Sequence, residues 1–570
     1  MKNPIPFHLF ASLAISFTLA ISAESTTAQD LEKVNIKKPI TIHGNVNVQF
    51  DYYHATGIPA RQKEFSWMIT GSPLINVLGV DVPLSFLISN YDNKFYQPFN
   101  QFGISPKYKW ATVHLGYRNI TFSNYTLAGH RILGGGFDLT PKKYRIGFMY
   151  GLLRRSTSID TTMNANPLYI RPAPVYKRMA LAGKVGYGTD KNFIDLIYFK
   201  GWDKTSSLDS KLKDSILPAE NTTIGINTKV TLTKKLTWSA DVGLSAYTQN
   251  RNDEKDTTGV KKDWPKSILG LLVKDKISSN YYFAGETRVG YTEKKWGAHL
   301  VYKRIDPSYQ SMGAYFFQND IQEISLANNF KLDSGRLNIN TSIGFQKDNL
   351  KKQKTSTSKR FIGNANISYT PSQKFGINFN YSNFGISNNP LPTSMSNELF
   401  KQVSNSFMLM PYFNWLNQRS IKNLNIIASY QSLNTPKSNL GSVPDLNTYS
   451  ITTVFNYTWI KEGINANAAV NYINSKTSAG DIGSYGGTIG GMIPLLQRKA
   501  TFNASGSYLQ NTFNNSSSGY TIRATAGFGV PIGTHHNFQL VGNYMTNSST
   551  SAVTPSFDEL TVQFIYGLTF

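Results

Sequence analysis

The feature that most constrains the fold is strict two-residue alternation in the final segment, residues 560–570. One face of this segment is apolar: Leu560, Val562, Phe564, Tyr566, Leu568 and Phe570. The opposite face is mostly polar and includes Gln563. A period of two is that of a β-strand. An apolar strand at a chain end forms an edge that aggregates, unless it closes a barrel by pairing with the first strand.

The same segment resembles the C-terminal strand of bacterial outer-membrane proteins, which ends in Phe. In those proteins the strand is read by the barrel-assembly machinery during insertion. The resemblance implies that Phe564, Tyr566, Leu568 and Phe570 form an insertion signal.

The alternation recurs along the whole chain, for example in residues 42–52, 337–345, 375–382 and 464–472. The polar face of these segments carries Asn, Ser, Gly and Gln rather than charge pairs. Such side chains suit a water-filled lumen better than a packed core, where every amide would need partners. We therefore expect a set of amides to face the lumen: Asn338, Asn340, Asn378, Asn380, Asn465, Asn467 and Gln563.

The connections between these segments alternate in length. Tight turns that carry lysine, such as residues 140–144, 233–235 and 292–296, are separated by longer polar segments such as 154–176 and 249–277. This pattern predicts an all-β fold: a single up-and-down antiparallel transmembrane β-barrel with short periplasmic turns and long extracellular loops. Counting the segments gives about 26 strands, with a range of 22–26, and residues 64–106 are the hardest to assign. Parity requires a short descending strand at 97–104.

The N-terminus carries a lysine followed by an uncharged apolar run and small residues, which predicts a secretory signal peptide over residues 1–28. Residues 29–40 are expected to form a short periplasmic arm, and residues 41–570 the barrel. The arm is too small for the globular plug of energy-coupled outer-membrane transporters, which argues against active transport.

Composition excludes several classes of function. The chain has no cysteine, which excludes disulfides and thiolate metal sites. Its net charge of +24 could suit nucleic acid, but the export signal and the absence of a basic helix or finger motif argue against that partner. We expect the lysine-bearing turns to form a basic ring at the periplasmic mouth that faces anionic surfaces of the envelope; a role in favouring anionic solutes or in binding a periplasmic partner is the alternative. The expected lipid partners are outer-membrane lipid and lipopolysaccharide.

Catalytic and metal motifs are absent from the sequence. There is no Gly-x-Ser-x-Gly, His-Glu-x-x-His or phosphate-binding glycine loop, and the eight histidines are scattered apart from His535-His536 in a predicted turn. We expect no enzyme activity, metal or cofactor.

One loop stands out because it contains an apolar run on a predicted extracellular connection. Its apolar residues are Trp264, Ile268, Leu269, Leu271, Leu272 and Val273. Such a run is unfavourable in water, so it is expected either to fold into the lumen as a constriction or to dock on a partner. The alternative is an extension of the flanking strands above the membrane.

Residues 102–110, 125–130 and 150–151 resemble the N-terminal part of a group of large Bacteroidota outer-membrane barrel proteins. The resemblance implies fold and location, and since no activity is established for that group, no functional residue is carried over. Two hypotheses remain for a barrel this wide. It is a passive conduit, porin-like or a translocation channel, or it is a non-conducting barrel subunit of an envelope secretion or assembly complex.

Overall fold

The computed structural model describes residues 40–77, 80–90, 101–158, 173–208, 216–258, 262–315, 318–354, 357, 359–387, 401–434, 445–478, 480–550 and 555–570. The signal peptide and nearly all of the arm expected at 1–40 lie outside these residues. Ile40 already belongs to the first strand.

The first half of the chain forms β1 Ile40–His43, β2 Asn45–Thr56, β3 Phe65–Gly71, β4 Leu74–Val77, β5 Val80–Ser89, β6 Gln101–Ile104, β7 Lys107–Tyr108, β8 Ala111–Asn119, β9 Arg131–Leu139, β10 Tyr144–Arg154, β11 Arg178–Thr189, β12 Asn192–Asp203, η1 Thr205–Ser207, β13 Glu220–Thr231, β14 Leu236–Thr248, α3 Lys266–Leu269 and β15 Ser279–Thr292. The second half forms β16 Trp296–Ile305, β17 Ile321–Leu332, η2 Asp333–Gly335, β18 Leu337–Lys347, β19 Lys359–Ser372, β20 Phe375–Ser387, β21 Lys401–Leu416, β22 Ser420–Asn434, β23 Leu446–Trp459, β24 Ile464–Thr477, β25 Gly480–Leu495, β26 Ala500–Phe513, β27 Ser516–Ile532, β28 His536–Ser549 and β29 Phe557–Thr569.

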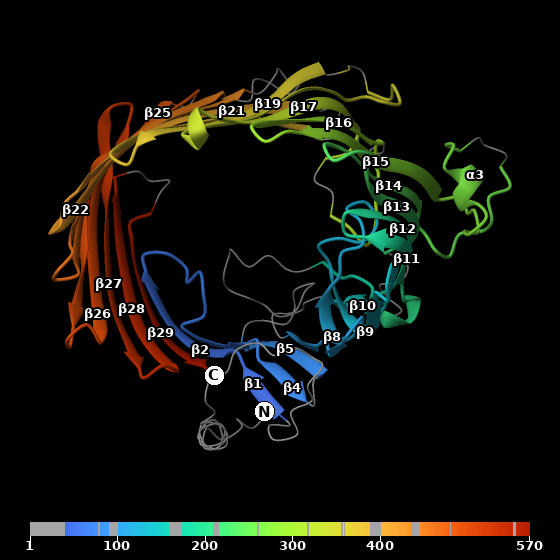
Figure 1. Cartoon of the computed structure of the whole chain (residues 1–570), viewed down its shortest axis with the longest axis horizontal. Coiled ribbons are helices and arrows are strands. Elements are labelled where there is room, and N and C mark those ends of the chain that lie inside the picture. The colour runs from blue at the N-terminus through green and yellow to red at the C-terminus, as the bar shows by residue number, and fades with distance from the viewer. Residues whose placement is uncertain are drawn as a thin grey trace.

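All 29 strand segments belong to one antiparallel sheet that closes on itself (Figure 1). β1 continues into β2, β3 into β4 and β6 into β7, because the members of each pair lie end to end against the same neighbours. The wall therefore contains 26 strands. The prediction of an even-numbered up-and-down barrel of about 26 strands is confirmed.

The seam that closes the barrel joins β2 to β29. Their register runs from Asn45 opposite Thr569 to Thr56 opposite Asp558. At one end of the seam, Gly44 and Phe570 exchange backbone hydrogen bonds of 2.7 and 3.0 Å. Gly44 has φ +143° and packs against the backbone of Pro73, so a side chain there would be strained. Closure leaves neither the first nor the last strand as a free edge.

The region that was hardest to assign contains the shortest strands of the wall. β6 holds four residues and pairs with both β5 and β8, so the predicted descending strand exists over 101–104. Residues 97–100 lie outside the described part of the chain.

Side chains alternate between the two faces of the wall. On β12, the outward Ile194 and Leu196 are 55% and 57% exposed, whereas Ile197, on the opposite face, is fully buried. From β9 onward, the connections at one rim are tight turns, and those at the other rim are longer as far as β23. Among the described residues, no helix is long and apolar enough to cross a bilayer.

Candidate functional site: the lumen and its two inner loops

Two long connections lie on the lumenal side of the wall near β10–β14 (Figure 1). They are residues 120–130, between β8 and β9, and residues 306–315, between β16 and β17; we name them the inner loops. A parallel bridge joins them, with the Ala128 amide donating to the Gly313 carbonyl at 2.8 Å. Tyr309 adds a hydrogen bond from its hydroxyl to the Tyr125 carbonyl at 2.7 Å.

The inner loops bury an apolar core against the wall. The larger cluster combines residues of both loops with lumenal residues of β9–β12 and with Ala219, which directly precedes β13: Ile120, Phe122, Leu127, Ile132, Met149, Leu153, Ala180, Ala182, Ile197, Phe199, Ala219 and Met312. A second cluster contains Tyr125, Ala284, Ile305 and Tyr309. Burying a side chain as large as Leu127 stabilises by about 1.5–3 kcal/mol, so the loops are packed structure rather than mobile surface.

Glycines in the wall let the loops approach this closely. A Cβ on Gly225 would lie 2.5 Å from Cγ2 of Thr126, and one on Gly243 would lie 2.8 Å from Cβ of Tyr125. Both glycines stand mid-strand, where glycine weakens a sheet unless close approach requires it. The wall is therefore shaped to receive the inner loops.

Buried polar groups fix the loops in place. Asp241 on β14 accepts hydrogen bonds from the Ser123 hydroxyl at 2.5 Å and the Asn124 amide at 3.0 Å. Asn221 on β13 accepts one from the Met312 amide at 2.9 Å. Each contact satisfies a group that would be costly to bury alone.

His130 and Tyr315 stack at the ends of the two inner loops, with ring centroids 3.8 Å apart. Burial, with a smaller contribution from the nearby Arg178, lowers the pKa of His130 to about 4. The imidazole is therefore neutral at pH 7, which suits its packing against a ring. Burial likewise raises the pKa of Tyr309, and the hydroxyl stays protonated as a donor.

Ion pairs on the lumenal wall flank the inner loops. Arg145 Nε lies 2.9 Å from Asp195, and Arg178 Nε lies 2.7 Å from Asp203. Nζ of Lys184 lies 5.0 Å from the centre of the Phe122 ring. We name the wall from β9 to β16, together with the inner loops, the covered half of the lumen.

The rest of the lumen is different. Val301 on β16, Ser325 on β17 and Gly344 on β18 lie opposite one another in register, so all three belong to the lumenal face. The amides expected to line the lumen share this face: Asn338 and Asn340 on β18, Asn378 and Asn380 on β20, Asn465 and Asn467 on β24, and Gln563 on β29. We name the wall from β18 to β28 the bare half. Among its described lumenal positions, Arg360 and Arg523 are the charged ones.

The bare half carries ladders of amides. Asn340 lies opposite Asn366 in register, and the Asn366 side-chain amide donates to Asn380. Asn456 donates to Asn423 at 3.3 Å, and Asn465 donates to the Thr458 hydroxyl at 2.9 Å. These are neutral groups with several donors and acceptors each, which makes a polar surface without fixed charge.

One serine–histidine–aspartate cluster lies where β6, β8 and β9 meet. The Ser105 hydroxyl lies 2.8 Å from Nδ1 of His114, whose Nε2 lies 2.9 Å from Asp138. A catalytic serine needs an accessible oxygen and a base at Nε2, whereas Ser105 is buried and meets the other ring nitrogen. The cluster ties a turn to the wall.

The segment expected to constrict the lumen lies elsewhere. Figure 1 shows α3 outside the ring, and Leu269 packs on Ala246 and Tyr281, which lie on the outward face of β14 and β15. The prediction that Trp264, Ile268, Leu269, Leu271, Leu272 and Val273 form a lumenal constriction is therefore wrong. The lumen is narrowed instead by the inner loops, which the sequence reasoning missed. Their signal in the sequence was the run 120–130, apolar residues interrupted by Ser and Asn.

The residues of the expected insertion signal lie on β29 and at its end. Phe564 and Tyr566 stand on the outward face, with their rings 6.3 and 4.9 Å from that of Phe538 on β28. The Tyr566 hydroxyl lies 2.8 Å from Nδ1 of His536. Leu568 lies opposite Val46 in register, and Phe570 follows the strand.

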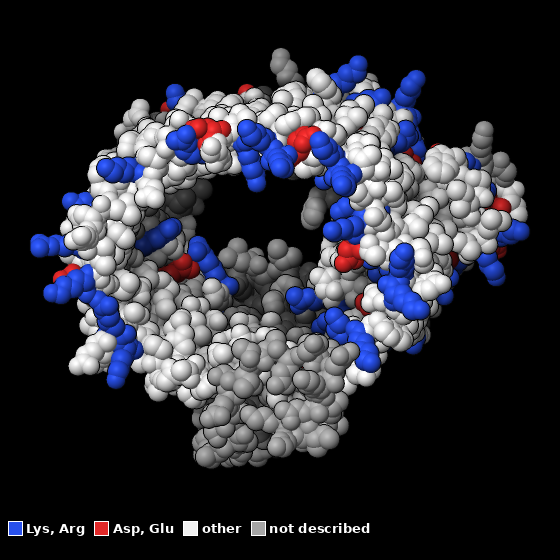
Figure 2. Space-filling view, viewed as in Figure 1, with Lys and Arg blue, Asp and Glu red and all other residues white. Residues whose placement is uncertain are grey.

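Lysine and arginine side chains surround the rim of the barrel, with few acidic ones among them (Figure 2). Those in the tight turns include Lys142, Lys234, Lys294, Lys461 and Lys499. Within the described residues, no three His, Asp or Glu side chains gather closely enough to hold a metal ion.

Comparison with known proteins gives structural matches of low similarity. No family model and no curated protein matches the chain. The translocation pore of the P pilus usher (PapC) is 11% identical at a TM-score of 0.36, covering 93% of this chain and 99% of that one. The FrpB iron transporter from Neisseria meningitidis (F3-3 variant) is 11% identical at 0.37, covering 96% and 84%. OccAB2 from Acinetobacter baumannii is 9% identical at 0.29, covering 62% and 92%.

Proposed function

We propose that this chain is an outer-membrane barrel that serves as a passive conduit, and that its path runs along the bare half of the lumen. The observation that carries the proposal is the division of the lumen. The inner loops pack on β9–β16, whereas among the described residues no such apolar layer covers the amide-bearing wall of β18–β28. Strand side chains alone cannot fill a barrel of 26 strands, so the bare half faces water, loops or a partner.

The lining indicates the class of cargo. Amides and hydroxyls can form hydrogen bonds with a polar cargo. Unlike fixed charges, they do not select strongly between cations and anions. With Arg360 and Arg523 as the charged groups among the described lumenal positions of this wall, the path suits polar, uncharged cargo over ions of one sign.

Planar-bilayer recording of the purified protein tests the proposal. We expect large, stable channels with weak selectivity between small cations and anions. A bilayer that stays electrically silent, with the protein shown by heat-modifiable gel mobility to be folded, would overturn the conduit.

The second candidate is a non-conducting barrel subunit of an envelope secretion or assembly complex. It is favoured by the inner loops, because their dry packed core resembles a structural insert more than the flexible constriction of a channel. Stoichiometric co-purification of envelope proteins together with electrical silence would support this candidate over the conduit.

The proposal includes the expected location and partners. The outward apolar face contacts outer-membrane lipid and lipopolysaccharide, and the barrel-assembly machinery reads β29 during insertion. Replacing Phe570 with Asp is expected to lower the amount of protein recovered in outer-membrane fractions several-fold, with Thr569→Asp as the neighbouring control. The proposal assigns no enzymatic role, no cofactor and no nucleic-acid partner.

A further inference from the structure

The connection between β14 and β15 forms a folded lobe on the outside of the barrel. Its described residues are 249–258 and 262–277, with α3 at its centre, and we name it the outer lobe. Figure 1 shows it projecting from the wall, away from the lumen.

The outer lobe is attached through an apolar contact. Leu269 is fully buried against Ala246 and Tyr281, with Ile224, Leu244 and Val273 packed around them. The ring of Trp264 lies 5.7 Å from that of Phe283. Leu244 and Phe283 belong to the outward face that continues down the wall as Val242 and Val289. The lobe therefore extends the lipid-facing surface of the barrel.

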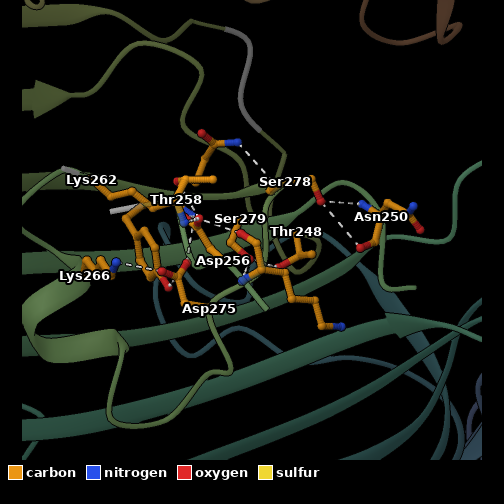
Figure 3. A network of polar contacts seen from close by, with 12 residues as sticks. Thr248, Asn250, Asp256, Thr258, Lys262, Lys266, Asp275, Ser278 and Ser279 are labelled. Atoms are coloured by element: carbon orange, nitrogen blue, oxygen red, sulfur yellow. Dashed lines mark hydrogen bonds and ion pairs between the residues drawn. The ribbon is translucent and has the colours of Figure 1, made fainter. Parts of the chain in front are cut away.

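Ion pairs hold the lobe rigid (Figure 3). Nζ of Lys262 lies 2.9 Å from Asp256 and 2.8 Å from Asp275, and Nζ of Lys266 lies 2.7 Å from Asp275. The Tyr281 hydroxyl donates to Asp275 at 3.1 Å. Hydrogen bonds from Thr258 and the ion pair with Lys262 lower the pKa of Asp256, so this carboxylate stays charged at neutral pH.

This rigid lobe presents large apolar side chains to its surroundings. Leu271 is 86% exposed, and Trp264, Ile268, Leu272 and Ile277 are each between 45% and 60% exposed. Full burial of one such side chain would stabilise by about 1.5–3 kcal/mol, so leaving these residues in water is unfavourable. A network that keeps them fixed and outward indicates that something covers them.

The position of the lobe identifies what covers it. On the outward face of β14, Trp238 marks the aromatic girdle near the tight-turn rim, where Trp296 and Tyr291 also pack together. Ala246 lies eight residues further along, about 27 Å of strand at ~3.4 Å per residue. For a strand tilted by about 40°, this is roughly 20 Å along the barrel axis, close to the far edge of an apolar belt about 25 Å tall.

We propose that the outer lobe is a membrane anchor whose apolar side chains enter the headgroup–acyl boundary of the outer leaflet. An element at this depth meets lipid, not bulk water, and its composition suits the boundary. The large apolar and Trp side chains project outward, while the exposed Lys274 lies close by in sequence to reach the headgroups.

Site-directed spin labelling tests the anchor. Because the chain has no cysteine, a nitroxide on Leu271→Cys reports on that position alone. The protein is placed in phosphatidylcholine nanodiscs, and the accessibility of the label to oxygen, which partitions into lipid, is compared with that to a water-soluble nickel chelate. Val289→Cys, on the lipid-facing wall, and Asn252→Cys, on the exposed surface of the lobe, serve as the matched references.

We expect the label at Leu271 to resemble Val289, with an oxygen-to-nickel ratio several-fold above that of Asn252. A ratio equal to that of Asn252 would overturn the anchor. The same label is also measured in native outer membranes, to detect a protein partner. A label that is exposed to water in nanodiscs but shielded in native membranes would assign the surface to such a partner and would also overturn the anchor. None of these outcomes depends on whether the barrel conducts.

Discussion

The covered half and the bare half of the lumen share the same strand geometry, but their lumenal side chains lie in different environments. In the covered half, fully buried residues such as Ile197 and Phe199 meet the inner loops, and ion pairs such as Arg145–Asp195 flank them. In the bare half, amides such as Asn366 and Asn380 bond to one another along the wall.

The difference shows how one sheet can carry packed inner loops on one part of its lumenal face and exposed amides on another. Gly225 and Gly243 remove side chains where a loop must approach, and the apolar residues beside them supply the contact. The amides of the bare half are poor partners for such packing, because every uncompensated donor would cost free energy in a dry contact. Side-chain choice at the lumenal positions thus decides which part of the wall is covered.

The largest expected effect comes from Tyr309→Ala. The residue is 1% exposed, and its hydroxyl holds the other inner loop. Removing a buried aromatic side chain is expected to destabilise the protein by about 3 kcal/mol and to increase single-channel conductance as the loops loosen. Urea unfolding in detergent and bilayer recording measure the two effects.

Tyr412→Ala is the matched control, since this tyrosine lies on the lumenal face of the bare half and is only partly buried. It should cost less than about 1 kcal/mol. Equal losses for the two variants would contradict the division of the lumen.

Gly243→Val should act on the same contact with a smaller effect. Its Cβ would lie 2.8 Å from that of Tyr125 and 2.9 Å from the Tyr309 hydroxyl, so the inner loops must shift, at a cost of about 1–3 kcal/mol. Gly506→Val provides the comparison, because no atom lies within 4 Å of an added Cβ there. Thermal unfolding monitored by gel mobility reports both, and a neutral Gly243→Val would argue against close packing of the loops.

The bare half is tested by adjacent cysteines on β24. Asn467 shares the lumenal face with Asn456, whereas Ala468 points the other way. A charged, membrane-impermeant thiol reagent should reduce the current through Asn467→Cys by a measurable fraction and leave Ala468→Cys unchanged. If both respond alike, or neither does, the path does not run along this wall.

The smallest effect expected is a pH dependence from His130. Its pKa is about 4 in the folded protein, against about 6.5 for an unperturbed histidine. Between these values the unfolded chain binds more protons, so stability falls as the pH drops from about 6.5 to 4 and changes no further below that. Unfolding midpoints measured across this range should decline less in His130→Phe, which keeps the ring stack with Tyr315 but cannot titrate. A parallel decline in both proteins would assign the pH dependence to other groups.

Much of the barrel could be predicted from local pattern. Alternation such as that of residues 337–345 fixes which side chains share a face, and tight turns such as 140–144 fix where strands reverse. These are nearest-neighbour properties of the backbone, so the antiparallel fold and the count of about 26 strands followed from them.

The contents of the lumen could not be predicted in the same way. Trp264–Val273 is the more apolar loop, yet it packs outside on Ala246, while residues 120–130 and 306–315 meet each other across more than 170 residues of chain. The inner-loop core depends on curvature that brings β8 and β16 to the same side of the ring.

The sequence by itself therefore determined the wall: its strands, their faces and their register-setting turns. Only the tertiary structure decided which loops enter the lumen and which pack on the outer face of the wall. The physical reason is that an apolar loop gains the same free energy from any apolar surface it covers, and which surface lies within reach is set by closure of the barrel.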